Sequence, residues 1–248
     1  MSVETKPIEN PLANHPVASH EQWLTARLAL LAEEKEHIRN HDRIAAARRD
    51  LPWVKIDKPY VFEDPDGLVG LADLFDGRSQ LLVYHFMFAQ DWDEGCTGCS
   101  FWSDHVDAAR QHFEHNDLSF AAVSRAPIDK LEKYRERMGW TFRWVSSKDS
   151  DFNFDFHVSA NSEEVAANKM YYNFTVSDGA EEELPGISVF YKDESGQIFH
   201  TYSGYSRSGE AQLGAYTFLD LAPKGRNEET NLMDWVKRHD CYEDGNSG

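Results

Sequence analysis

The stretch Leu81-Leu82-Val83-Tyr84-His85-Phe86-Met87-Phe88, followed after a loop by Gly95-Cys96-Thr97-Gly98-Cys99, decides the fold of this chain. Its first part is a nearly unbroken apolar run, which is typical of a central strand covered by helices on both faces. After the cysteines, one apolar stripe at helical spacing predicts a helix, and it consists of Trp102, Val106, Ala109 and Phe113. The cysteine pair therefore lies where a buried strand ends and a helix begins.

The downstream sequence continues this alternation of strands and helices. We expect a strand at 118–123, a helix at 128–138, a strand at 142–145 and a β-hairpin formed by 187–191 and 198–202. This order predicts an α/β fold in which a central mixed sheet is flanked by helices in three layers. Right-handed crossovers would place the cysteines at the carboxyl end of a central strand, where the sites of α/β proteins usually lie.

Three further segments give weaker signals. Phe152, Phe154 and Phe156 alternate with polar residues, which indicates a half-buried strand or an extended flap. The run 181–183 contains only glutamates and is interpreted as a solvated acidic turn, and residues 232–236 suggest a last short helix.

The chain before the core domain is predicted to be helical. Ser19 and Gln22 have the spacing of a capping box, and leucines at helical spacing follow until Pro52 ends the helix. We therefore divide the chain into a flexible tail at 1–18, an N-terminal helical extension at 19–50 and a core domain at 51–240. The extension is interpreted as a docking helix, with an arm that forms a homodimer as the alternative.

Composition excludes several classes of partner. The 248 residues include 25 Lys and Arg but 43 Asp and Glu, and the net charge is −18. Phosphate contacts need clustered cations, so we expect neither nucleic acid nor an anionic membrane surface as a partner. No apolar run is long enough to span a membrane, and the N-terminus lacks the apolar segment of a secretory signal, so we expect a cytoplasmic protein.

The cysteines point to redox chemistry. The chain has three, Cys96, Cys99 and Cys241, too few to act as a disulfide scaffold. At a helix N-terminus the free N–H groups and the helix dipole stabilise a thiolate. Cys96 is therefore the predicted attacking thiol, and Cys99, one turn later, is the predicted resolving thiol. Acidic residues at 91, 93 and 94 are expected to oppose this effect and to raise the pKa of Cys96.

Other residues near the pair are candidates for supporting roles. Thr97 and Gly98 lie between the thiols, and Trp92 precedes them and is a candidate for an apolar lip that contacts substrate. Arg125, at a strand end, is either an anion contact or a solvated cation. His85 is either a proton relay or a hydrogen-bonded core histidine.

A metal- or ligand-binding module without enzymatic activity, on the same fold, is the alternative hypothesis. One C-x-x-C motif supplies two of the four ligands that structural zinc usually takes. The others would come from Cys241 with His239, or from His105 or His112. We expect no cofactor and no metal for the oxidoreductase, whose partner would be a thiol or disulfide substrate or a reductase.

Several motifs resemble those of the DUF899 family, a bacterial group assigned to the thioredoxin-like superfamily. The matching stretches are Leu82–Phe88, Gly95–Asp104, Leu51–Val54, Phe120–Pro127, Arg137–Phe142, Ser150–Phe156 and Phe199–Ser203. The resemblance extends from about residue 23 to residue 240. It implies a thioredoxin-like fold, a bacterial source and a dithiol oxidoreductase role for Cys96 and Cys99.

The chain also departs from ordinary thioredoxins. They carry a cis-proline before the strand that faces the dithiol, and in the comparable stretch, 186–189, Ser188 takes its place. They bury an acid in the strand before the dithiol, and Tyr84 occupies that position here, so Tyr84 becomes a candidate for proton handling. The segment from residue 67 to residue 88 is closer to peroxiredoxin-like relatives, which adds a peroxide or a small-molecule disulfide to the expected substrates.

Overall fold

The computed structural model describes residues 15–242. The chain separates into two compact units. Of the described residues, one unit contains 15–51 and Phe218–Asn227, and the other contains Pro52–Thr217 and 228–242. Both cysteines of the motif belong to the second unit.

The main element of the first unit is the helix α1, His20–Arg49. It begins with the predicted capping box, in which the Gln22 N–H donates to Ser19 Oγ at 3.2 Å and the Ser19 N–H donates to Gln22 Oε1 at 3.0 Å. These bonds satisfy donors that the first turn of a helix leaves free. No residue of α1 is buried.

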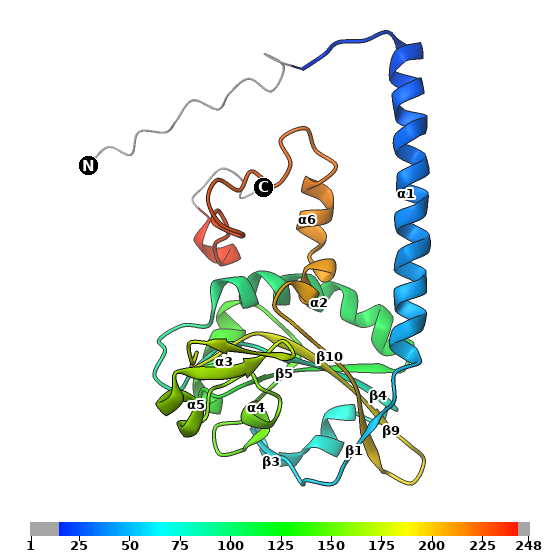
Figure 1. The fold of residues 1–248 in the computed structure, drawn as a ribbon. Helices are drawn as coiled ribbons and strands as arrows, with labels where there is room; N and C mark the ends of the chain where they lie inside the picture. Colours follow the sequence, from blue (N-terminus) through cyan, green and yellow to red (C-terminus); the bar gives the residue numbers. More distant parts are fainter. Residues whose placement is uncertain (1–14, 243–248) are drawn as a thin grey trace, which may run out of the picture. The chain divides into compact units, whose positions relative to one another are not determined.

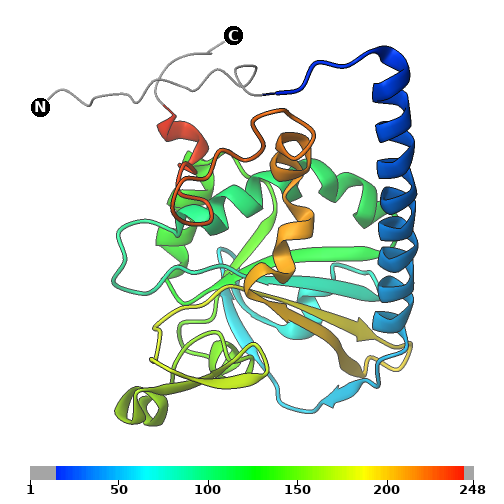
Figure 2. The same cartoon turned by 45° about the horizontal axis from the view of Figure 1, so that its top comes forward.

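The second unit is built on a mixed sheet of eight strands. Their order is β1 (Val54–Ile56), β10 (Ile198–Tyr205), β9 (Gly186–Lys192), β4 (Gln80–His85), β5 (Leu118–Ser124), β6 (Arg143–Ser146), β2 (Val61–Asp64) and β3 (Gly67–Gly70). The central strands β4, β5 and β6 run parallel, whereas the β9–β10 hairpin pairs antiparallel with β4. Figure 2 shows this hairpin alongside the central strands.

Helices cover both faces of this sheet. Tyr84 of β4 and Phe86, the residue after the strand, face α2 (Thr97–His115) and α3 (Ile128–Arg137). Leu81 and Val83 face the 3-10 helix η1 (Leu71–Phe75) and α4 (Phe152–Asp155) on the other side. Figure 1 shows α2 and α4 on opposite sides of the strands. The predicted α/β fold, a central mixed sheet flanked by helices, is thereby confirmed.

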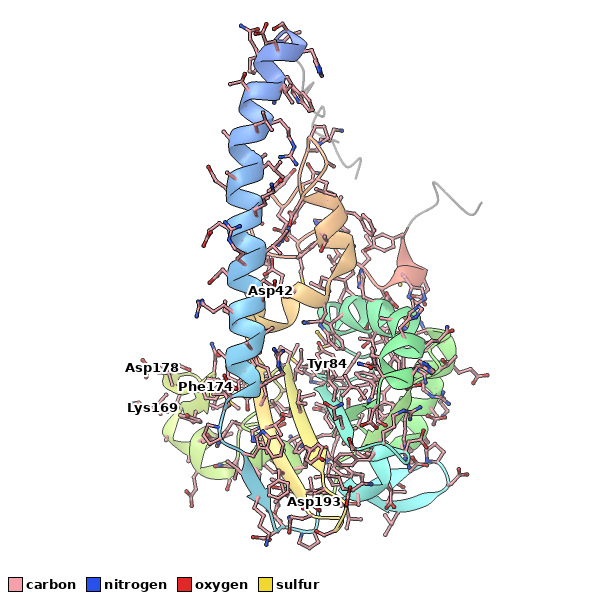
Figure 3. The ribbon with its side chains drawn as sticks, turned by 90° about the vertical axis from the view of Figure 1, so that its right-hand side faces the viewer. Asp42, Tyr84, Lys169, Phe174, Asp178 and Asp193 are labelled. Carbon is pink, nitrogen blue, oxygen red and sulfur yellow. The ribbon has the colours of Figure 1, made fainter. Side chains whose placement is uncertain are left out.

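The remaining elements lie outside this sheet. They are α5 (Ser162–Ala167), the hairpin of β7 (Lys169–Tyr172) and β8 (Thr175–Asp178), η2 (Ser206–Gln212), α6 (Gly214–Leu219) and η3 (His239–Cys241). Figure 3 labels Lys169, Phe174 and Asp178 on the β7–β8 hairpin, which the sequence analysis did not predict. In the part of the chain that the structure describes, no helix is both long and apolar enough to cross a membrane.

The structure corrects two predicted elements. The alternating phenylalanines form a helical turn, not a strand, because Phe152 and Phe156, four residues apart, both pack into the core with ring centroids 4.6 Å apart. Residues 232–235 form turns, and residues 232–236 contain no helix.

Candidate active site at the Cys96–Cys99 dithiol

Cys96 lies at the N-cap of α2, just beyond the carboxyl end of β4. Its N–H donates to the Met87 carbonyl at 3.1 Å, which ties the loop back to the end of the strand. Its own carbonyl accepts the first helical hydrogen bond, from the Ser100 N–H at 2.9 Å, and its Sγ accepts from the Cys99 N–H at 3.4 Å. A thiolate at this position therefore receives donors that the helix cannot otherwise use.

These contacts lower the pKa of Cys96 to about 7. The largest cause is the hydrogen bond that the Cys99 thiol donates to it. Backbone N–H groups of Cys99 and Gly98 and the positive charge of Arg238 act in the same direction, against the effect of burial. At neutral pH a substantial fraction of Cys96 is therefore thiolate, the form that attacks disulfides.

Cys99 has the opposite character. Its side chain is buried, and burial together with the neighbouring Cys96 raises its pKa well above the ordinary value. Hydrogen bonds from the Tyr84 hydroxyl and from the Met87 N–H, the latter at 3.5 Å, partly offset this effect. The two thiols are therefore unequal, one ionised near neutral pH and the other held as a thiol.

The Tyr84 hydroxyl, on β4, is hydrogen-bonded to the buried Cys99 thiol. Tyr84 is labelled in Figure 3, and its ring stacks on Trp102 of α2 at a centroid distance of 4.0 Å. Burial is the main cause that raises the pKa of its hydroxyl well above 10, and the neighbouring Cys99 acts in the same direction. Tyr84 therefore stays protonated and acts as a hydrogen-bond donor to Cys99, not as a base.

Arg238 contacts the loop that precedes Cys96, and no sequence motif pointed to this arginine. Its guanidinium donates to the Gly95 carbonyl at 2.6 Å and to the Tyr134 hydroxyl at 2.7 Å, and it pairs with Glu94 at 2.8 Å. Glu94 also pairs with Arg137, and these cations hold its pKa below the usual range.

This ion-pair network corrects the expectation for the acidic loop. The carboxylates at 91, 93 and 94 were expected to oppose the helix effect, but none of them is among the main causes that set the lowered pKa of Cys96. The nearest of them in sequence, Glu94, is neutralised by two arginines from distant segments, and one of these arginines also acts on Cys96.

An apolar pocket opens beside the thiols, with a volume of about 240 Å³. Its floor contains Tyr84, Cys96 and Cys99, and one wall is the stretch Pro185–Ile187 at the start of β9. Leu232 and Met233, from the segment after α6, form another wall. A Cβ added to Gly98 would come within 3.4 Å of Met233 Sδ and 3.9 Å of Cys96 Sγ, so the Met233 thioether lies directly above the first turn of α2.

The structure places the other predicted site residues at different distances from this pocket. Gly98 lines it, and Thr97 begins α2 beside Cys96. Trp92 does not line the pocket. Its indole N–H instead donates to Glu182 Oε2 at 3.1 Å.

Arg125 is neither a solvated cation nor part of the pocket lining. It pairs with the buried Glu183 at 3.3 Å and lies over the ring of Phe154. Glu183 was predicted to lie in a solvated turn, but it is only 5% exposed and also accepts from Ser159. Burial raises the pKa of its carboxyl to about 7 despite the arginine.

His85 and Ser188 lie on the opposite face of the sheet from the thiols. His85 Nε2 is 2.8 Å from Ser188 Oγ, which is 2.8 Å from Ser203 Oγ, which in turn is 2.8 Å from His200 Nε2. Burial lowers the pKa of His85 to about 3, and its ring stacks against the rings of Phe152 and Phe156. These four side chains form a buried hydrogen-bonded chain that we call the His–Ser chain.

The pocket wall also corrects the proposed position of Ser188. The residues that face the thiols are Pro185, Gly186 and Ile187, so Ser188, which points into the other face, does not stand in the place of the thioredoxin proline. Among residues 15–242 no peptide bond is cis. The nearest proline to that place is Pro185, one residue before β9.

The residues suggested as further metal ligands make hydrogen bonds and contacts with residues other than Cys96 and Cys99. His239 Nδ1 is 2.7 Å from Asp104 Oδ1, and the exposed Cys241 lies 3.6 Å from Arg137 Nη2. His105 bridges the Phe101 carbonyl and the Ala215 N–H. Within the described residues, no three His, Cys, Asp or Glu side chains are grouped as a metal ion would require.

Comparison with known proteins gives a family match. The model of a family described as "Bacterial protein of unknown function (DUF899)" matches residues 12–242, nearly the whole chain. No curated protein matches the chain.

Several solved structures are similar to the chain at low sequence identity. Peroxidoxin BcpB from Mycobacterium tuberculosis is 15% identical, with 66% of this chain and 96% of that chain covered and a TM-score of 0.43. Peroxiredoxin Q from Xanthomonas campestris is 16% identical, with coverage of 64% and 89% and a TM-score of 0.41. A thiol:disulfide interchange protein from Bacteroides sp. is 15% identical, with coverage of 72% and 94% and a TM-score of 0.40.

Proposed function

The chain belongs to the DUF899 family, and we propose that it is a thiol–disulfide oxidoreductase that uses Cys96 as nucleophile and Cys99 as resolving thiol. The observation that carries this proposal is the inequality of the two thiols. Cys96 has a pKa of about 7 at a helix N-terminus, whereas the adjacent Cys99 is buried with a raised pKa. Disulfide exchange needs this division, because one thiol must attack first and the other must wait.

The first step is attack of the Cys96 thiolate on one sulfur of a substrate disulfide. A bond forms between Cys96 Sγ and that sulfur, the substrate disulfide breaks, and the other half leaves as a thiolate. The positive charge of Arg238 and the N–H groups of Gly98 and Cys99 stabilise the attacking thiolate before this step. As the mixed disulfide forms, Cys96 loses its negative charge. Because that charge helps to raise the pKa of Cys99, its loss lowers the pKa of Cys99 and makes the second thiol easier to ionise.

The second step resolves the mixed disulfide. Cys99 gives its proton to the departing thiolate, attacks Cys96 Sγ and releases the second half of the substrate as a thiolate. The Tyr84 hydroxyl and the Met87 N–H both donate to Cys99 and so stabilise its thiolate at this point. Two electrons have then passed from the dithiol to the substrate, and a dithiol donor must return them before the next cycle.

Trapping of the mixed disulfide tests this assignment. All proteins should carry Cys241→Ser, because that exposed thiol would otherwise react with the probe. With hydroxyethyl disulfide as the probe, the Cys99→Ser variant should hold one substrate half on Cys96, visible as a mass increase that a reductant reverses. The Cys96→Ser variant should hold none at the same pH and time.

Two outcomes would contradict the proposal. Adducts of equal yield on both variants would mean that the thiols are not divided into nucleophile and resolving thiol. Thiols that stay unreactive until a chelator is added would mean that the pair holds a metal ion, as in the alternative hypothesis of a binding module.

A further inference from the structure

We propose that the substrate of this site is a small disulfide with an apolar substituent, held in the pocket beside Cys96, rather than a protein disulfide. The inference rests on the proposed function and names its substrate class. It follows from the shape, lining and closure of the pocket.

The size of the pocket limits the ligand. Its volume of about 240 Å³ is below the range of about 300–1,000 Å³ that drug-sized ligands occupy. An apolar cavity of about 150 Å³ is enough to bind benzene, so this pocket has room for an aromatic ring or a short branched chain. A folded protein that approached with its backbone would not enter a space of this size.

The lining selects apolar groups. Beyond the two sulfurs, the groups that face the cavity include the Trp102 ring and the side chains of Met87, Ile187 and Leu213. Apolar surface of this kind gains free energy by excluding water from an apolar ligand and offers few partners to a polar one. The charged residues of the lining, Arg207 and Glu210, pair with each other at 2.6 Å.

The segment that closes the pocket is tied down at several points. The Met233 N–H donates to Glu228 Oε1 at 2.8 Å, and the same oxygen accepts from the Tyr216 hydroxyl at 2.6 Å. Five residues later, Arg238 holds the Gly95 carbonyl and Glu94. Because Leu232 and Met233 lie between these anchors, they form a fixed wall beside the nucleophile.

The chemistry of this step is that of the proposed function. The apolar half of the disulfide occupies the pocket and places its sulfur against Cys96 Sγ. The new sulfur–sulfur bond forms there, and the other half leaves toward solvent as a thiolate. Cys99 then releases the bound half by forming the Cys96–Cys99 disulfide, so one disulfide is reduced to two thiols and one dithiol is oxidised.

Single-turnover kinetics with three probes test the substrate class. Reduced protein carrying Cys241→Ser would be mixed with dithiodipyridine, an aromatic disulfide, with hydroxyethyl disulfide, a hydrophilic one, and with insulin, a protein. Each rate constant would be divided by that of the glutathione thiolate with the same probe, which removes differences in leaving-group reactivity. We expect the normalised constant for the aromatic probe to exceed the other two by about tenfold or more.

A matched pair of variants locates the effect in the pocket wall. Leu232→Lys places a charge in the lining and should lower the normalised constant for the aromatic probe by about tenfold, with little change for hydroxyethyl disulfide. Leu68→Lys makes the same change at an exposed leucine of β3 outside the pocket and should leave both constants unchanged.

The results separate the two proposals. Equal normalised constants for the three probes, or the largest constant for insulin, would overturn the substrate class while leaving disulfide exchange in place. Absence of Cys96-dependent exchange with every probe would overturn the proposed function and the substrate class with it.

Discussion

Tyr84 and His85 are neighbours on β4, yet they belong to regions of opposite character. Tyr84 faces two thiols of unequal pKa beside an apolar pocket. His85 faces the His–Ser chain, in which each hydroxyl and one nitrogen of each ring already has a partner. A second cavity, of about 310 Å³, lies beside His200 and Ser203, whose Nε2 and Oγ atoms are engaged in that chain.

The difference teaches that buried polar residues alone do not mark a site. Burial of a hydrogen-bonded group is ordinary core structure, because an unpaired buried polar atom is costly. The dithiol region instead combines a group whose charged form is stabilised with open space in which a reactant fits. On this criterion the His–Ser chain belongs to the core, and the dithiol is the region to which we assign the proposed chemistry.

The largest expected effect is the loss of the nucleophile on the dithiol side. Cys96→Ser should reduce the rate of disulfide exchange by about 10³-fold or more, because a hydroxyl is not ionised near neutral pH and does not replace a thiolate. The free energy of unfolding should change by less than about 1 kcal/mol. Stopped-flow exchange and denaturant unfolding of the same preparation measure both, and retention of the exchange rate would contradict the assignment.

The matching change on the other face should affect stability instead of rate. Ser188→Ala leaves His85 Nε2 and Ser203 Oγ each without one partner, and the expected loss in the free energy of unfolding is about 2–4 kcal/mol. The rate of exchange should stay within about twofold of the parent. Ser177→Ala, at an exposed position on β8, is the control and should cost less than about 0.5 kcal/mol. A large fall in exchange rate with unchanged stability would assign chemistry to the His–Ser chain.

The pH dependence of exchange should report Cys96. Its pKa is lowered, so the thiolate fraction and the rate should rise with pH through a midpoint near 7 and then level off. Arg238→Gln removes a positive charge that favours the thiolate and should move the midpoint upward by less than about one pH unit. Lys237→Gln removes the same charge from an exposed neighbour and should leave the midpoint in place. A shift with both variants would point to net charge and not to the contact.

The smallest effect is expected at the rim of the dithiol region. Trp92→Phe removes the indole N–H that donates to Glu182 while keeping an aromatic ring. We predict a change of less than about threefold in exchange rate and less than about 1 kcal/mol in the free energy of unfolding. A tenfold or larger loss of rate with small disulfides would restore the earlier interpretation of Trp92 as a residue that contacts substrate.

The sequence predicted what local patterns encode. The strand ending at His85, the helix carrying Cys99, the β9–β10 hairpin and the Ser19 capping box all arise from spacing within a few residues, and all are present. The position of Cys96 at the start of α2 was also predicted, and the roles of attacking and resolving thiol inferred from it stay a prediction.

Contacts between distant segments were not predictable in this way. Arg238 reaches the site loop from 143 residues away, and no local pattern distinguishes it from the other arginines. Glu183 belongs to a run of glutamates typical of a solvated turn. Its carboxylate is nevertheless buried, where it pairs with Arg125 and accepts a hydrogen bond from Ser159. The α4 turn was misassigned because alternating phenylalanines fit a strand until tertiary packing selects Phe152 and Phe156 as one face.

A redox titration of the purified protein tests the central claim most directly, with thiols trapped by maleimide and counted by intact mass. The account predicts a reversible two-electron transition confined to Cys96 and Cys99, at a potential within the range of roughly −120 to −270 mV that dithiol oxidoreductases show. Failure of the two thiols to form a disulfide at any potential in that range, or labelling that begins only after a chelator is added, would contradict it.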